Sequence, residues 1–184
     1  MTIRPYQEKD KENVRFVCLN SDGPNEHCEE TNFYILTTYC DYYIEQEPEN
    51  CFVAVDENDR AVGYVICTED YDKYFAGITA GYVQRFPEEN EDARNGILHS
   101  ADPQREYKAE YPAHLHIDLL PEYQRMGIGH KLVDALCAHL RAKGIPGVML
   151  TAGPDNVKGR NFYRKYGFTE LQVTESDVAY GLKL

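Results

Sequence analysis

The chain has 184 residues, of which 42% are hydrophobic, and it carries a formal net charge of −12. That length and apolar content can form one well-packed domain and are too small for two comfortable ones. The acidity argues against nucleic acid as a partner, because phosphate binding requires a basic surface. It is compatible with plain solubility and also with cationic acceptors such as amines.

The first ten residues lack the apolar segment of a secretory signal, and no later stretch has the length needed to cross a bilayer. We therefore expect a soluble, cytoplasmic protein with no membrane partner. Its 6 cysteines are scattered without a C-x-x-C pair, and several lie in apolar runs. This distribution favours reduced, buried thiols.

The first part of the chain contains both clear and unclear patterns. Residues 2–6 predict a short extended segment and residues 9–19 a helix. Residues 20–50 are rich in Tyr, Glu and Asn and show no clean period. Residues 51–67 predict a β-hairpin with its turn at 56–59.

A long segment without a strong strand pattern follows, from Glu69 to Pro112. A structureless loop of that size is unusual inside a compact domain, so we expect helical turns there, in particular from Tyr71 to Arg85. The segment is a candidate lid over a ligand site.

The strand predicted at 114–120 has a polar face. Its alternation places His114, His116 and Asp118 on one face and apolar residues on the other, and Pro121 ends it. A strand that is covered on both sides is expected to be apolar on both faces. The polar row is therefore either part of an acceptor site or a hydrogen-bonded structural network.

The segment after this strand has the pattern of an anion-binding loop. Gln-Arg-Met-Gly-Ile-Gly at 124–129 opens an amphipathic helix predicted at 128–143, which Gly144 would cap. The glycines permit a sharp turn, and the free N–H groups of the first helical turn can bind phosphate oxygens. The spacing matches neither the P-loop signature GxxxxGK[ST] nor the dinucleotide-binding signature GxGxxG. We therefore expect the loop to bind a pyrophosphate in a site of a different type.

The remaining sequence predicts a strand at 147–151, a helix at 158–166 ended by Gly167, and two strands within 168–184. The order of hairpin, strand, helix, strand, helix and strand is typical of an α/β fold around a mixed sheet.

Two motifs resemble those of the GCN5-related N-acetyltransferases. One is Gln-Arg-x-Gly-x-Gly after a strand that ends in Leu-Leu-Pro, and the other is Asn-Phe-Tyr-Arg-Lys-Tyr-Gly-Phe, preceded by Asn156. The resemblance is strongest at 111–171. More narrowly, it is to the acetyltransferase-like domain attached to some O-GlcNAcases and to its stand-alone bacterial relatives.

The resemblance implies a fold and a division of the chain. The fold would be a mixed, mostly antiparallel central sheet with helices on both faces, in a single N-acetyltransferase domain over residues 1–184. The cofactor-binding core would lie at about 113–168. Acceptor-side elements would lie at 20–50 and 70–112.

The resemblance also implies residues that bind acetyl-CoA as co-substrate. The backbone of Leu119 would pair with the pantetheine arm and help to polarise the thioester carbonyl. Asn156 would contact coenzyme A, and Tyr163 would lie close to the departing sulfur. The loop that would hold the pyrophosphate consists of Gln124, Arg125, Met126, Gly127, Ile128, Gly129, His130 and Lys131, with side-chain charge from Arg125 or Lys131.

The sequence departs from the family pattern at Gly159, where alanine is commoner. Glycine has a low helix propensity, so we expect the last helix to begin a residue or two later than usual.

The expected reaction requires two proton transfers. An amine that attacks a thioester must lose a proton, and the thiolate that leaves must gain one. Asp118 or His116 could accept the first proton, directly or through water, and Tyr163 could donate the second or hold the sulfur. Structural hydrogen bonding is the alternative for each of these residues. No cysteine is obviously placed for an acetyl-enzyme, so we expect direct transfer.

Two further side-chain groups suggest ligands. The tyrosines predict an aromatic acceptor cleft, with ordinary packing as the alternative, and they are Tyr34, Tyr39, Tyr42, Tyr43, Tyr71, Tyr74, Tyr107 and Tyr111. A metal site at His114, His116 and Asp118, or at His27 and Cys28, would lack further ligands of diagnostic spacing, so we expect none.

The sequence leaves two functions open. The first is an acetyl-CoA-dependent N-acetyltransferase that acts on a small-molecule or peptide amine in a ternary complex. The second is a catalytically inactive domain of the same fold that serves as a binding or regulatory module, because a fold alone does not establish activity. The acyl-chain preference and the oligomeric state are also open, with a homodimer as one alternative.

Overall fold

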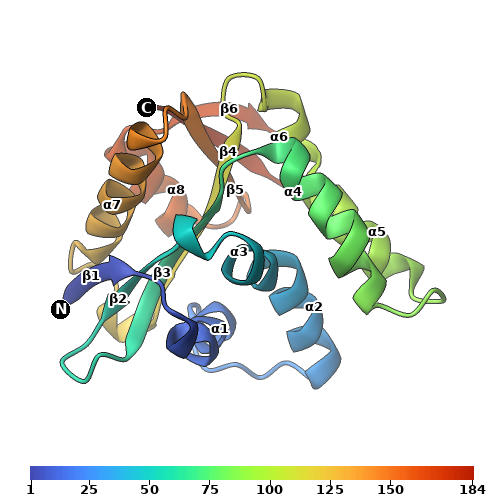
Figure 1. Ribbon diagram of the computed structural model, residues 1–184, viewed down its shortest axis with the longest axis horizontal. Coiled ribbons are helices and arrows are strands. Elements are labelled where there is room, and N and C mark those ends of the chain that lie inside the picture. The colour runs from blue at the N-terminus through green and yellow to red at the C-terminus, as the bar shows by residue number, and fades with distance from the viewer.

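One seven-stranded sheet organises the computed structural model, which describes all residues from 1 to 184 (Figure 1). The strand order is β1-β2-β3-β4-β5-β7-β6, and every neighbouring pair is antiparallel except β4 and β5. The strands are β1 (Thr2–Pro5), β2 (Phe52–Val55), β3 (Ala61–Thr68), β4 (Ala113–Leu119), β5 (Gly147–Ala152), β6 (Thr169–Val173) and β7 (Val178–Lys183). The predicted mixed, mostly antiparallel sheet is confirmed.

Helices cover both faces of the sheet (Figure 1). The first five pack on one face around a core that includes Val17, Tyr43 and Tyr64. The last two pack on the other face around a core that includes Leu136 and Val65. The helices are α1 (Lys11–Asn20), α2 (Glu29–Tyr39), α3 (Asp41–Gln46), α4 (Tyr71–Gly77), α5 (Glu91–Ser100), α6 (Asp102–Tyr107), α7 (Ile128–Ala142) and α8 (Val157–Tyr166).

The parallel pair β4 and β5 is joined over a short distance only. Its partners are Ala113 with Val148 and His114 with Met149. The rest of β4, from Leu115 to Leu119, remains paired to β3 but has no partner on β5. The sheet is therefore split between these two strands, and the polar row of β4 continues along the split.

Two segments contain helices that the sequence pattern did not predict. Residues 20–50 form α2 and α3, and the second half of 69–112 forms α5 and α6 in addition to the expected helical turns from Tyr71. In α3 three consecutive residues, Tyr42, Tyr43 and Ile44, are all buried. Because this helix is covered on several sides, its sequence lacks the one-sided apolar stripe by which helices are recognised.

The other predicted elements agree with the structure to within one to three residues. The hairpin is β2 and β3, and the amphipathic helix is α7, followed by Gly144 with a φ of 75°. The amides of Gly144 and Ile145 donate to Arg141 and Leu140, so the predicted glycine cap is confirmed.

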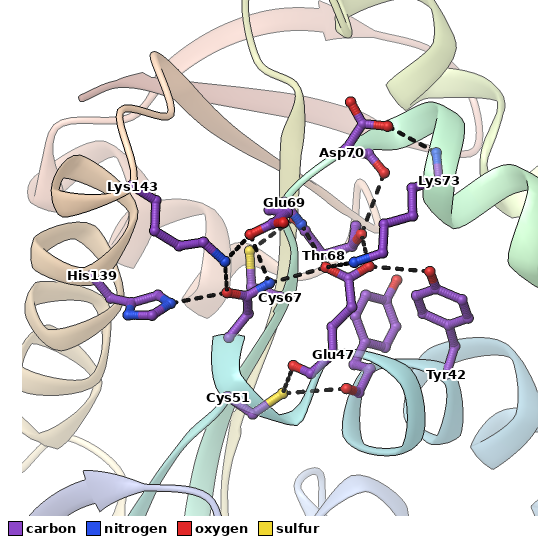
Figure 2. A network of polar contacts seen from close by, with 12 residues as sticks. Tyr42, Glu47, Cys51, Cys67, Thr68, Glu69, Asp70, Lys73, His139 and Lys143 are labelled. Atoms are coloured by element: carbon purple, nitrogen blue, oxygen red, sulfur yellow. Dashed lines mark hydrogen bonds and ion pairs between the residues drawn. The ribbon is translucent and has the colours of Figure 1, made fainter.

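A fully buried carboxylate joins α3 to the sheet (Figure 2). Glu47 has 0% exposure, and its Oε1 accepts hydrogen bonds from Thr68 Oγ1 at 2.6 Å and Tyr42 Oη at 3.1 Å. Its Oε2 accepts from the backbone N–H of Glu69 at 3.1 Å and from Asn50 Nδ2 at 3.0 Å. All these donors satisfy a charge that would otherwise be too costly to bury.

The same network reaches His139 and Lys143 on the opposite face of the sheet (Figure 2), and Asn50 makes the connection. Its Oδ1 accepts from His139 Nε2 at 2.9 Å and from Lys143 Nζ at 3.0 Å, both at the end of α7. The network therefore fixes α3, the end of β3 and α7 relative to one another. Since α3 carries Tyr43, it also positions the side chains that face the polar row of β4.

Candidate active site

A row of unpaired backbone amides lies where β4 gives way to α7. The N–H groups of residues 125–130 donate no hydrogen bond within the protein, and the first amide of α7 with an acceptor is Lys131, which donates to Gly127 O at 3.4 Å. Arg125 and Gly127 have φ values of 61° and 76°. These left-handed residues curl the chain so that consecutive amides can face one anion.

Most of the predicted pyrophosphate residues lie in this amide loop, which comprises residues 124–130. Arg125, Met126, Gly127 and His130 are exposed, as is Lys131 on the first turn of α7. Neither Arg125 nor Lys131 forms an ion pair with a carboxylate. Both cations are therefore free to add charge to the amides.

The side chain of Gln124 is engaged within the protein. Its Nε2 donates to the carbonyl oxygens of Ser21 at 2.8 Å and Leu119 at 3.0 Å. It thereby ties the amide loop to the end of β4 and to the end of α1. Its backbone N–H donates to Pro121 O at 3.3 Å, so Gln124 has a supporting position and its predicted direct contact with the pyrophosphate is wrong.

Two glycines allow close packing beneath the amide loop. A Cβ at Gly63 of β3 would lie 2.2 Å from Leu119 Cδ2, and a Cβ at Gly129 would lie 3.2 Å from the ring of Phe162. Gly63 therefore admits the Leu119 side chain, and Gly129 lets α7 approach α8. Ile128 is buried and contributes to the core on this face.

The last helix begins at Val157, so the expectation of a later start caused by Gly159 is wrong. Asn156 is the N-cap, and its Oδ1 accepts from the Gly159 N–H at 2.8 Å. A Cβ at residue 159 would lie 2.7 Å from Asn156 Nδ2. The cap compensates for the low helix propensity of glycine, and glycine leaves room for the cap.

The polar row of β4 faces tyrosines from α2, α3 and β3. The hydroxyl of Tyr43 lies 2.5 Å from His114 Nε2 and 3.1 Å from His116 Nε2. Tyr64 donates to Asp118 Oδ2 at 2.5 Å. His114 is buried, with 1% exposure, whereas His116 and Asp118 are partly exposed beside the split.

Burial shifts the pKa of each side chain in the row so that the neutral form is favoured. It lowers the pKa of His116 to about 4 and, together with the charge of neighbouring His116, lowers that of His114 well below its usual value. Burial raises the pKa of Asp118 to about 6, against the opposing effect of hydrogen bonds from Tyr64 and Ser21. At neutral pH the histidines are uncharged and Asp118 is mostly ionised.

Tyr163 of α8 approaches the split from the opposite face. Its side chain is 9% exposed and packs against Phe162, Phe168 and Tyr180. Burial raises its pKa above that of a free tyrosine, and the charge of Asp118 adds to this rise. The two predicted catalytic groups are thus close enough to interact across the sheet.

A pocket of about 250 Å³ lies beside the polar row. Of the tyrosines that predicted an aromatic cleft, Tyr39, Tyr43 and Tyr74 line it together with His116. No sequence pattern indicated the remaining wall, which consists of Ser100, Gln104, Thr151, Ala152, Gly153 and Asp177. These residues come from α5, α6, the end of β5 and the turn before β7, so only the fold brings them together.

The other predicted tyrosines do not line this pocket. Tyr42, Tyr71 and Tyr111 are buried in the apolar cores, which is the packing alternative. The six cysteines are all free, and Cys28 is exposed, unlike the buried Cys40, Cys51, Cys67 and Cys137.

Clusters suited to a metal ion are absent, since three or more His, Cys, Asp or Glu side chains nowhere converge in a suitable arrangement. None of the helices combines the length and apolar character that crossing a membrane requires.

The sequence profile of the acetyltransferase (GNAT) family matches residues 20–168. The chain therefore belongs to this family. The family predicted from the two motifs is confirmed, and with it the fold.

Two curated proteins illustrate the range of relatives. N-alpha-acetyltransferase 30 of Schizosaccharomyces pombe is 28% identical over 127 residues, which are 69% of this chain and 62% of that protein. Protein O-GlcNAcase of Rattus norvegicus is 24% identical over 190 residues, which are 95% of this chain and 20% of that protein. The chain spans less than two thirds of the length of either relative.

Solved structures show the same fold. SsHAT superposes with a TM-score of 0.88 at 30% identity, over 99% of this chain and 97% of that one. The PaiA N-acetyltransferase of Thermoplasma acidophilum in complex with coenzyme A has a TM-score of 0.62 at 18% identity, over 100% of this chain and 98% of that one. At that identity the second likeness concerns the fold alone.

Proposed function

We propose that the protein is an acetyl-CoA-dependent N-acetyltransferase that transfers an acetyl group to a primary amine by direct attack in a ternary complex. The observation that carries this proposal is the row of unpaired amides at residues 125–130, which opens beside the split between β4 and β5. A pyrophosphate would satisfy these donors, and the helix dipole of α7 would add to the attraction.

The residues around the split fit acetyl-CoA, which supplies an activated acetyl group when bound. The unpaired amides, Arg125 and Lys131 would hold the pyrophosphate, and the free edge of β4 near Leu119 would face the pantetheine arm. Met126, just before α7, and Val157, the first residue of α8, are exposed apolar side chains, at 64% and 62%. A fold neighbour that binds coenzyme A supports this assignment.

Asp118 is the better of the two candidate proton acceptors. A group whose pKa is about 6 is mostly ionised at neutral pH and still binds a proton, whereas His116, with a pKa of about 4, is the weaker base. We assign proton acceptance to Asp118, directly or through water, and a hydrogen-bonding role to neutral His116. Tyr163 keeps its proton at neutral pH because its pKa is raised, so it can donate to the departing sulfur.

The lining of the pocket agrees with direct transfer. No cysteine contributes to its wall, so a covalent acetyl-cysteine intermediate has no thiol there. The pocket lies beside His116, on the face of the sheet opposite Tyr163, so an acceptor amine and a thioester could meet at the split from two sides.

An inactive binding or regulatory module is the second candidate. It is favoured by the hydrogen bonds that engage His114, His116 and Asp118, because a satisfied network is also what a purely structural row requires. The segment of the O-GlcNAcase relative that matches this chain is only 20% of that protein. In that relative the matching segment is therefore one part of a larger protein, which is consistent with a module.

Calorimetric titration with acetyl-CoA tests the first part of the proposal. We expect binding in the micromolar to submillimolar range, and absence of binding at millimolar concentration would defeat the enzyme assignment. Release of the free thiol of coenzyme A across a panel of small amines and peptides then separates a catalyst from a passive binder.

Two substitutions give this assay its controls. Tyr163→Phe and Asp118→Asn should each lower kcat by about 100-fold, the usual contribution of general acid or base catalysis. Tyr166→Phe is the matched control, because Tyr166 lies one turn further along α8 and its hydroxyl donates to Asp134 at 2.7 Å. Thiol release that is unchanged in Tyr163→Phe and Asp118→Asn would remove these residues from the mechanism.

A further inference from the structure

A second cavity lies next to the pocket beside His116, and the two share one lining residue. This outer groove has a volume of about 400 Å³ and lies between the α5–α6 segment and the turn that joins β6 to β7. Asp177 lines both spaces, so it stands at the junction between them. A ligand that extends from the pocket into the outer groove would pass this carboxylate.

The two cavities differ in their walls. The pocket has the aromatic faces of Tyr39, Tyr43 and Tyr74 and one carboxylate, whereas the outer groove adds the carboxylates of Asp102 and Glu106. Apart from the tyrosines, the other titratable groups in the walls are His116 in the pocket and His99 in the groove. No lysine or arginine lines either space, although Arg105 pairs with Asp102 at 3.2 Å from outside the wall.

Asp177 is held in place with one oxygen unused. Its backbone N–H donates to Thr174 Oγ1 at 3.0 Å, and its Oδ2 accepts from Ser176 Oγ at 2.6 Å. Its Oδ1 has no hydrogen-bond donor in the protein. Asp177 and Tyr39 line the same pocket, and the charge of Asp177 contributes to the raised pKa of Tyr39, after burial and Tyr34.

A carboxylate beside aromatic rings is suited to a cation. The ring faces attract positive charge through their quadrupoles, and Asp177 attracts it directly. The inner end of the pocket is different, because His116 is uncharged and the amine that reacts there must give up its proton. The wall of the pocket therefore carries no charged group at its His116 end and a carboxylate at its Asp177 end.

We propose that the acceptor is an amine that carries a second, non-reacting cationic group, and that Asp177 binds this second cation at the mouth of the pocket. The proposal rests on the proposed acetyltransferase function and specifies its substrate class. The second cation can belong to a diamine or to a basic side chain in a peptide, since both present the same chemistry to Asp177.

Matched acceptors test the proposal. The thiol released from acetyl-CoA is measured with 1,5-diaminopentane and with pentylamine, which have the same chain length and differ in one charge, and with a lysine-containing and a norleucine-containing dipeptide. We expect kcat/KM to be about tenfold higher for the dication of at least one pair, as one partly buried ion pair provides. If the amine pair has the larger ratio of kcat/KM, the second cation belongs to a diamine; if the dipeptide pair has it, the cation belongs to a basic side chain in a peptide. Equal values in both pairs would overturn the proposal.

Two variants locate the effect. Asp177→Asn should reduce the ratio of kcat/KM between dication and monocation toward one, whereas Glu175→Gln should leave it unchanged. Glu175 is an exposed carboxylate in the same turn and lines neither cavity, so it controls for net charge. A ratio that survives in Asp177→Asn would also contradict the proposal.

A binding measurement separates this proposal from the proposed function. If no amine releases thiol, calorimetry of 1,5-diaminopentane and pentylamine with the protein, in the presence of coenzyme A, still reports on Asp177. Tighter binding of the diamine that is lost in Asp177→Asn supports the cation site without catalysis. Equal binding of both amines overturns it, whatever the protein catalyses.

Discussion

The two sides of the split are built from different kinds of sequence. The cofactor side consists of the amide loop, α7 and α8, and its groups are close together along the chain. The acceptor side consists of residues from α2, α3, α4, α5, α6 and the β6–β7 turn, which meet only in the folded protein. Anion binding by backbone amides requires one local turn, whereas an acceptor pocket can be shaped by whatever the fold places around it.

The acceptor side therefore depends more on long-range contacts. The pocket tyrosine Tyr43 sits on a helix of only six residues, α3, whose end is tied to β3 and α7 through Glu47 and Asn50. The amide loop instead begins a helix of 15 residues with its own apolar face. Perturbations of the Glu47 network should thus affect the pocket before the amide loop.

The largest expected effect comes from Glu47→Ala. It would leave the Tyr42 hydroxyl and the Glu69 N–H without an acceptor, and it would leave Thr68 and Asn50 with only their longer bonds to Asp70 O and Glu69 Oε2. We expect the free energy of unfolding to fall by about 3 kcal/mol or more. Urea denaturation measures this loss, with the exposed neighbour Glu49→Ala as control.

Hydrogen exchange in the same variant tests the comparison between the two sides. Amides of α3 and α4 should lose more protection than those of α7. Equal loss throughout would show that the two sides fold as one unit and that the comparison fails.

The next effect distinguishes a functional Asp118 from a structural one. Its folded pKa of about 6 lies above the unfolded value of about 3.9, so the native state binds this proton more tightly. The contribution of Asp118 to stability therefore falls as the pH rises from about 4 to 6, and the ionised group opposes folding above that window. Asp118→Asn should be more stable than the parent at pH 8 by about 1 to 2 kcal/mol, after allowance for partial exposure.

Thermal unfolding at pH 8 and pH 4 measures this difference, which should disappear at the lower pH. The activity of the parent should rise with pH through about 6, as Asp118 becomes able to accept a proton. Loss of activity together with a gain in stability is the mark of a strained functional group. A variant that is less stable at pH 8 would indicate that the carboxylate serves the structure.

These contrasts explain how much could be predicted from the sequence. The strand with the polar face, the amide loop and the capped α7 follow from local patterns, namely the alternation around His116, the glycines and the stripe that includes Leu132 and Leu136. The partners of those groups do not follow from local patterns. That Tyr43 bridges two histidines and that Asp177 closes the pocket depend on helix and turn placement, for which a single sequence carries no period or motif.

A smaller effect tests the amide loop through a pair of glycines at the two ends of α7. Gly127 and Gly144 have φ values of 76° and 75°, and a Cβ at either position would meet no atom within 4 Å. Alanine should therefore destabilise both sites by about 1 kcal/mol, from backbone strain alone. Only Gly127→Ala should weaken acetyl-CoA binding, by several-fold, because it disturbs the row of amides. Calorimetry that finds equal affinity in the two variants would argue against pyrophosphate at this loop.

The smallest effect concerns Gly159, where two contributions to the free energy of unfolding oppose each other. Alanine favours the helix by about 1 kcal/mol, but its Cβ would lie 2.7 Å from Asn156 Nδ2 and would push the cap away from the Gly159 N–H. Loss of the cap costs about the same, so Gly159→Ala alone should change stability by less than about 0.5 kcal/mol. In an Asn156→Ala background, where nothing remains to displace, the same substitution should stabilise by nearly the full 1 kcal/mol. Denaturation of the four proteins in this cycle measures the coupling, and simple additivity would mean that glycine at this position does not serve the cap.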